Sequence, residues 1–419
     1  MDDGGWIDQR GRDDRARELL AVTVIAAVIL AALGQPLLVL LCLLVAVVLV
    51  AALVWQRYGL ANVAYTRMLS ATRAFPGEEL TIELAVENRK LLPLPWLEVR
   101  DELPAALDYT DLAPEPSAKP GVVIGKLTYT LGPYQRVRRR YRLRCRTRGI
   151  HAFGPATLRT SDVFGLATRE ETVPGEQLLL VYPEIVALDD LGIPPADPFG
   201  DARSHRPVWE DPLEVAGIRP YVAGDPPRRL HWRASARSGA LLSRRLDRTA
   251  APVVAVFIDV NTFDHFWEGI DSALLERVIS TGASLLMRAV EERRQVGLFV
   301  NAPLRGGERI VRIRPSRHPG QLTRCLEALA LIIAHTGDRI ETLVAREARD
   351  MPPGATIVVV TGHLTSALEQ TVARLHRAGR SIVCVTIGAR PTLVPRGGLA
   401  VHVVGVEERD DDMASAAQA

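Results

Sequence analysis

Two uncharged apolar runs near the N-terminus constrain the fold of this 419-residue chain more than any other feature. They cover residues 19–33 and 37–54, and a Gly-Gln-Pro turn separates them. A helix rises about 1.5 Å per residue, so a bilayer core of about 30 Å needs about 20 apolar residues. Each run is slightly short, but Trp55 extends the second at the membrane interface. The pattern predicts a transmembrane helix hairpin over residues 19–55. A single bent span and a signal peptide are the alternatives; the second run, acting as a stop-transfer segment, argues against a signal peptide.

The arginines beside these runs predict which side of the membrane holds the soluble part of the chain. Arginine and lysine near the ends of membrane helices concentrate on the cytoplasmic side. Four arginines precede the first run, Arg57 follows the second, and the turn between them is uncharged. We therefore expect a two-pass protein of the cell inner (plasma) membrane, with residues 1–18 and the soluble domains in the cytoplasm.

Composition excludes several other classes of protein. The net charge is only +2, which provides no general attraction to nucleic acid. The four cysteines lack the spacing of metal ligands, and their small number fits a reducing compartment without disulfides. The acidic and then Ala/Ser-rich end, residues 408–419, is typical of a disordered tail.

Residues 60–182 alternate apolar and polar side chains with period two, which predicts half-buried strands and a β-sandwich-like domain. In residues 136–148 every even position is arginine, so one face of this strand is basic. The central arginines of that face are Arg138, Arg140, Arg142, Arg144 and Arg146. A solvated face that protects a sheet edge is the simplest interpretation. Contact with anionic headgroups of the inner leaflet is the alternative. Nucleic-acid binding is the weakest, because no aromatic side chains interleave with these arginines.

Residues 251–407 predict a doubly wound α/β domain. Residues 251–259 form a continuous apolar run ending in Asp259, which is typical of a buried parallel strand, and strands then alternate with helices. Ligands of such sheets bind at the carboxyl ends of the strands, where Asp259 and Thr361 are expected.

Residues 217–239, within a linker over residues 183–250, contain Gly, Asp, Pro, Trp and Arg too densely for an ordinary helix or strand. Gly224 and Asp225 begin a turn that two prolines complete. Asp225 is expected to anchor this turn and pair with an arginine, and Trp232 to be buried as an apolar anchor.

This segment resembles the core motif of the bacterial domain-of-unknown-function 58 family, and residues 148–155 and 161–166 also resemble that family's sequence. His231 stands where the family more often has Asp. The matched signature positions are Arg219, Tyr221, Gly224, Asp225, Arg229, His231, Trp232, Ala236, Arg237 and Gly239. The resemblance implies a membrane-anchored interaction module whose α/β domain is similar to a von Willebrand factor A domain. It also implies association with MoxR-type AAA+ ATPases and with transglutaminase-like membrane proteins.

The resemblance to von Willebrand A domains raises the question whether this chain binds a divalent cation. Those domains hold a divalent cation with an Asp-x-Ser-x-Ser motif, where this chain has Asp259, Asn261 and Phe263. Phe263 cannot be a ligand, and a Gly follows Thr361 where the family has a second Asp. We expect no cofactor; Mg²⁺ at a degenerate site of Asp259, Asn261 and Thr361 is the exception that the motif allows.

The leading hypothesis is a non-enzymatic adaptor or scaffold that presents clients at the inner leaflet, together with a MoxR-type AAA+ ATPase. One alternative is a metal-dependent hydrolase using Asp225, His231 and Asp259. The other is binding of nucleic acid or anionic lipid through the basic strand, residues 136–148. The chain lacks Gly-x-Ser-x-Gly, His-Glu-x-x-His and a phosphate-binding glycine loop with lysine, so no catalytic residue is assigned.

Overall fold

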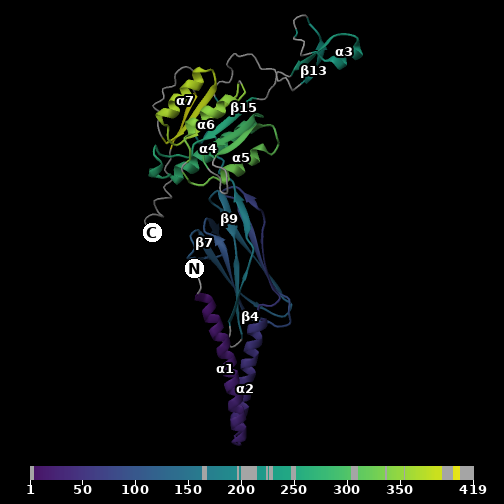
Figure 1. The fold of residues 1–419 in the computed structure, drawn as a ribbon, viewed down its shortest axis with the longest axis vertical. Coiled ribbons are helices and arrows are strands. Elements are labelled where there is room, and N and C mark those ends of the chain that lie inside the picture. Colours follow the sequence, from purple (N-terminus) through teal and green to yellow (C-terminus); the bar gives the residue numbers. More distant parts are fainter. Residues whose placement is uncertain are drawn as a thin grey trace. The chain divides into compact units, whose positions relative to one another are not determined.

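The computed structural model describes residues 4–162, 168–195, 198–199, 215–222, 225, 230–246, 252–302, 310–335, 337–352, 354–388 and 400–405. The chain divides into two compact units, Met1–Tyr182 and Pro183–Ala419. An apolar helical region, a β-rich region and an α/β region follow one another along the chain (Figure 1). This order confirms the coarse fold that the sequence predicts.

Two consecutive helices open the first unit, α1 (Gly4–Ala32) and α2 (Pro36–Tyr58). Gly34 adopts a φ of 71° in the turn between them, a conformation that glycine tolerates best. Among the described residues, α2 is the one helix long and apolar enough to cross a membrane. The uncharged part of α1 starts at Leu19 and covers only about 21 Å.

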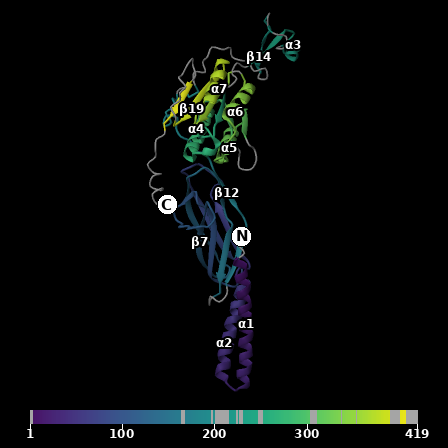
Figure 2. The same ribbon diagram turned by 60° about the vertical axis from the view of Figure 1, so that its left-hand side comes forward.

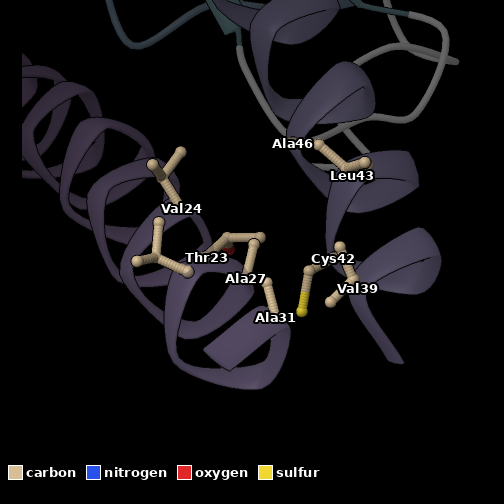
Figure 3. Close-up of a pocket in the computed structure, with 9 residues that line it drawn as sticks. Thr23, Val24, Ala27, Ala31, Val39, Cys42, Leu43 and Ala46 are labelled. Atoms are coloured by element: carbon tan, nitrogen blue, oxygen red, sulfur yellow. The ribbon is translucent and has the colours of Figure 1, made fainter. Parts of the chain in front are cut away.

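The helices α1 and α2 lie side by side in both views of the fold (Figures 1 and 2). A pocket of about 270 Å³ lies between them. Figure 3 shows the small and apolar side chains that line it. Its lining includes Thr23, Ala27 and Ala31 of α1 and Cys42, Leu43 and Ala46 of α2. The short side chains leave this space because they do not reach across the gap between the two backbones.

The β-rich region contains two larger sheets with the strand orders β1-β3-β8-β5 and β11-β10-β4-β7-β6, and a third with the order β2-β12-β9. Buried side chains of β3, β4, β7 and β8 form one apolar cluster, so the larger sheets share a core. The strands are β1 (Val63–Leu69), β2 (Arg73–Ala74), β3 (Glu79–Asn88), β4 (Leu94–Pro104), β5 (Leu107–Tyr109), β6 (Glu115–Pro116), β7 (Val122–Leu131), β8 (Arg136–Cys145), β9 (Gly149–Phe153), β10 (Ala156–Ser161), β11 (Thr168–Val173) and β12 (Gln177–Val181).

A buried ion pair joins these sheets. Arg67 of β1 donates from Nε to Asp101 Oδ2 of β4 at 2.9 Å, and its Nη2 pairs with Asp101 Oδ1. Arg67 Nη1 also donates to the Phe153 carbonyl of β9 at 2.6 Å, and the Tyr65 hydroxyl donates to Asp101 Oδ2 at 2.7 Å. Gly154 lies against this group: a Cβ there would come within 2.9 Å of the Arg67 guanidinium. One arginine thus ties three sheets together.

The α/β region is a six-stranded sheet with the order β17-β16-β15-β18-β19-β20, in which only β17 runs antiparallel to its neighbour. Helices α6 and α7 pack on one face through a buried apolar cluster, and α4 and α5 contact each other and the sheet elsewhere. The elements are β15 (Val253–Ile258), a short 3₁₀ turn (Phe266–Glu268), α4 (Ser272–Glu291), β16 (Gln295–Val300), β17 (Val311–Ser316), α5 (Gln321–Ala330), α6 (Ile340–Asp350), β18 (Thr356–Thr361), α7 (Ser366–Arg377), β19 (Ser381–Ile387) and β20 (Ala400–Val404).

Candidate functional site

The signature segment folds as a strand, a short helix and a strand: β13 (Val215–Pro220), α3 (Trp232–Ser238) and β14 (Leu242–Leu246). The expectation that it is too irregular for a helix or strand was therefore wrong. Strands β13 and β14 pair antiparallel, and Leu230 bridges to Ser243 of β14. We call β13, α3, β14 and the described residues between them the signature module. Gly224 and Arg229 lie outside the described residues.

Several signature side chains hold the module together. Arg219 Nη2 donates to Asp225 Oδ1 at 2.6 Å, and Asp225 Oδ2 accepts from the Val222 backbone N–H at 3.2 Å. The hydrogen bond from Arg219 is the main reason that the pKa of Asp225 lies below its usual value. His231 caps α3, because its Nδ1 accepts from the Ala234 N–H at 3.2 Å.

The ends of α3 explain two further signature positions. Gly239 follows the helix in the left-handed region, with a φ of 67° and its N–H donating to the Ser235 carbonyl. Ala236 and Arg237 are exposed on α3 itself, and Tyr221 is half-buried beyond β13. Asp225 and His231 thus each serve the local fold, Asp225 as a turn anchor and His231 as a helix cap.

Trp232 is exposed, so the prediction that it is buried as an apolar anchor was wrong. Its side chain is 67 % exposed at the first position of α3. Ile218, Val222 and Leu241 of the same module are also about half exposed, at 48 %, 59 % and 53 %. Leu230 is buried, at 9 % exposed. A helix this short on a two-stranded pair encloses little core, which is why these four apolar side chains remain exposed.

Asp259 lies at the centre of a buried network at the carboxyl ends of three parallel strands. It follows β15 and is 3 % exposed. Its Oδ1 accepts from Asn301 Nδ2 at 2.7 Å and from the Asn261 N–H at 3.1 Å. Its Oδ2 lies 3.0 Å from Thr361 Oγ1, which is also 2.8 Å from the His363 carbonyl. Burial raises the pKa of Asp259 to about 6.

The structure therefore brings the three predicted residues Asp259, Asn261 and Thr361 together, and adds Asn301. Asn301 is completely buried just after β16, and its Nδ2 also donates to the Asp338 carbonyl at 2.7 Å. The sequence could have indicated Asn301, because it is a polar residue at the end of an apolar strand, as Asp259 and Thr361 are.

The atoms around Asp259 do not suit a divalent cation. Mg²⁺ requires free oxygen ligands in an octahedral arrangement, whereas N–H groups approach Asp259 Oδ1 from two sides. The side-chain oxygen Oδ1 of Asn261 accepts from the Gly337 N–H at 3.0 Å, so it is already used as a hydrogen-bond acceptor. Within the described part of the chain, no group of three or more His, Cys, Asp or Glu side chains is placed to hold a metal. The Asn301 amide nitrogen, 2.7 Å from Asp259 Oδ1, is a hydrogen-bond donor and cannot serve as a cation ligand.

The basic face of β8 carries opposite charges on its neighbours. Residues of β8 and β3 pair as Glu79 with Arg144, Glu83 with Arg140, and Glu87 with Arg136. Arg140 Nε donates to Glu83 at 2.8 Å, and this hydrogen bond is the main cause that lowers the pKa of Glu83. Arg142 and Arg146 pair with Asp111 and Asp108 at 3.0 and 2.5 Å, and Arg138 lies 3.8 Å from Glu83. The alternating charges favour a solvated outer face.

We expect replacement of Arg140 and Arg142 by glutamine to change neither the thermal midpoint nor the retention of single-stranded DNA in a gel-shift assay. Exposed ion pairs contribute little to stability, and their carboxylates already offset the positive charge of this face. A DNA affinity of the wild type that falls steeply with salt, and that the double variant loses, would contradict this expectation.

Part of this chain is similar to a described protein family, and most of it is similar to one curated protein. The family model of the protein of unknown function DUF58 matches residues 217–409. The uncharacterized protein YeaD of Bacillus subtilis is 22 % identical over 315 residues, which cover 74 % of this chain and 72 % of YeaD.

Likenesses to solved structures are weak. The CARDB domain of a Pyrococcus furiosus protein, solved with two metal ions, is 14 % identical, with 28 % of this chain and 93 % of that chain covered and a TM-score of 0.20. A cohesin module from Clostridium perfringens is 10 % identical, with 28 % and 96 % covered and a TM-score of 0.20. Scores this low carry no argument about fold or function. The informative similarity is to DUF58, over a segment that includes both Trp232 and Asp259.

Proposed function

We propose that this protein is a membrane-anchored, non-enzymatic adaptor whose signature module is a contact surface for a partner protein. The observation that carries the proposal is the exposure of Trp232 together with Ile218, Val222 and Leu241. Residues 217–248 contain eight arginines and two aspartates, so the same segment is strongly basic. Tryptophan and arginine are the side chains most enriched at the energetic centres of protein interfaces.

The chemistry of the site supports binding rather than turnover. Asp225 is held by Arg219 and a backbone N–H, His231 caps α3, and Asp259 is surrounded by hydrogen-bond donors inside the α/β region. A general base needs a proton of the substrate within hydrogen-bond reach. Both carboxylates and the Nδ1 atom of His231 instead hydrogen-bond within the fold, which disfavours the hydrolase alternative.

The anchor is a two-pass helix hairpin formed by α1 and α2 in the inner membrane, with both ends cytoplasmic. The exposed apolar surface of α2 supports this topology, as do the arginines in the first half of α1 and Arg57 in the last turn of α2. The β-rich region is a β-sandwich-like domain, and the α/β region is a von Willebrand A-like domain. By resemblance to the DUF58 family, the partner is a MoxR-type AAA+ ATPase, with a transglutaminase-like membrane protein in the same assembly.

The test is crosslinking and co-purification of the tagged full-length protein from its native membrane, followed by mass spectrometry. We expect the wild type to recover an AAA+ ATPase, and Trp232→Ala with Arg237→Glu to reduce that recovery at least tenfold. Both side chains are exposed, so the double variant should fold as the wild type does. Leu178→Ala, at a similarly exposed apolar residue of β12, is the matched control and should keep full recovery. Recovery of no ATPase by the wild type, under conditions that capture known membrane complexes, would refute the adaptor.

A further inference from the structure

The exposed apolar side chains of the β-rich region are unevenly distributed. Outside α1 and α2, the described part of the first unit exposes four large ones, and Leu91 and Tyr134 are the most exposed, at 74 % and 70 %. They come from different turns, the β3–β4 loop and the β7–β8 turn. The two turns are nevertheless adjacent, because the Tyr134 N–H donates to the Lys90 carbonyl at 3.2 Å. Tyr134 also adopts a φ of 53°, which is uncommon for a residue other than glycine.

These turns are attached to the end of α2. Trp55 Nε1 donates to the Pro93 carbonyl of the β3–β4 loop at 3.2 Å, and Lys90 Nζ donates to the Gly59 carbonyl at 2.8 Å. The end of α2 has a third attachment, because Arg169 of β11 donates to the Arg57 carbonyl at 2.9 Å. Because lysine and arginine satisfy the last carbonyls of the helix, α2 enters the β-rich region through a fixed junction.

The length of α2 determines where this junction lies relative to a membrane. From Pro36 to Trp55 the helix has 20 residues, so it rises about 30 Å, which is the thickness of the bilayer core. If α2 spans the bilayer, Trp55 lies at the interface, where tryptophan is enriched. The β3–β4 loop is hydrogen-bonded to Trp55 and must therefore lie at the same level.

We propose that the β3–β4 loop and the β7–β8 turn contact the lipid surface of the cytoplasmic leaflet, with Leu91 and Tyr134 in the interfacial layer. This inference rests on the membrane anchor in the proposed function. The surface has the composition of an interfacial site: Leu91, Tyr134 and the half-exposed Tyr58 lie with the cation Arg57 and with Arg89, which pairs with Glu87 at 3.0 Å. The contact would restrict the tilt of the β-rich region on the membrane.

The test measures how deeply spin labels lie in the bilayer. The full-length protein, with Cys42→Ala, is reconstituted in vesicles of phosphatidylethanolamine and phosphatidylglycerol. Single cysteines at Leu91 and Tyr134 are labelled with a nitroxide, and its accessibility to oxygen and to a water-soluble nickel chelate is compared. The three remaining native thiols are buried, and burial raises their pKa values to about 11 or 12, so they react slowly with the label.

Two further sites make the outcomes distinguishable. Val47, 67 % exposed on α2, reports on the anchor itself, and Leu178, 51 % exposed on β12, is the aqueous control. Val173, at the end of β11, lies about 13 Å along that strand from Arg169, and Leu178 follows further along the chain in β12. We expect the ratio of oxygen to nickel accessibility at Leu91 and Tyr134 to lie between the two references and several-fold above that of Leu178.

A lipid-exposed label at Val47 together with values at Leu91 and Tyr134 equal to that of Leu178 would overturn the surface contact and leave the anchor standing. An aqueous label at Val47 would overturn the anchor, and the surface contact with it.

Discussion

Replacing Arg67 with methionine should lower the free energy of unfolding of the β-rich region by about 3–5 kcal/mol, because removing one partner of a buried ion pair leaves the other charge uncompensated. Asp101 is completely buried, and burial holds its pKa above the usual value although Arg67 acts to lower it. In the variant the carboxylate would keep only the Tyr65 hydroxyl, and the Phe153 carbonyl would lose its donor.

Native-state hydrogen exchange of the full-length protein in nanodiscs is the appropriate measurement, since it reports on β3 and β4 without assuming that both units unfold together. Arg140→Gln is the control: it removes an exposed ion pair of a neighbouring strand and should leave protection unchanged. The double variant Arg67→Met with Asp101→Leu should regain part of the loss, because it leaves no buried charge. Equal protection in Arg67→Met and wild type would show that the pair does not hold the sheets together.

Replacing Asp259 with alanine should leave the α/β region about 2–4 kcal/mol less stable than replacing it with asparagine, because alanine leaves buried donors unsatisfied. In Asp259→Asn, the side-chain oxygen can accept from Asn301 and the Asn261 N–H. The new amide can donate to Thr361 Oγ1, which then donates to the His363 carbonyl. Asparagine thus preserves every bond of the network, whereas a cation site would lose its only carboxylate.

The pH dependence provides a second readout. Burial raises the pKa of Asp259 to about 6, while an unfolded aspartate titrates near about 3.9. Between these values the folded chain keeps a proton that the unfolded chain has lost, so the free energy of unfolding falls as pH rises from about 4 to 6. The difference between the two pKa values corresponds to a loss of up to about 3 kcal/mol in the free energy of unfolding over this pH range. Asp259→Asn lacks this titration, and we expect it to be at least as stable as the wild type at pH 7.

Thermal unfolding of the full-length protein at pH 4 and pH 7, with and without Mg²⁺, separates the two interpretations of this site. We expect Mg²⁺ to leave the midpoint of the α/β transition unchanged in wild type and in Asp259→Asn alike. A midpoint that rises with Mg²⁺ in the wild type and not in the variant would restore the predicted cation site.

The periodicity of the sequence predicted the type of each region and several of its strands, because it reports which side of an element is buried. The alternation in residues 136–148 identified β8 and its basic face, and the run ending at Asp259 identified β15. Asn301 was not found as a partner of Asp259, since the pairing of β15 with β16 brings together residues 42 positions apart. Asn261 and Thr361 were predicted for a cation, but the sequence could not show that amides and backbone N–H groups already surround the carboxylate.

What the sequence determined by itself is the order of an apolar helix, a β-rich region and an α/β region, because each follows from local spacing of apolar side chains. Only the tertiary structure decided the exposure of Trp232, the burial of Arg67 against Asp101 and the attachment of the β3–β4 loop to Trp55. Tryptophan and arginine occur both in cores and on surfaces, so their type does not reveal their environment. Their environment depends on which strands and turns pack against them, and those partners lie far away in the chain.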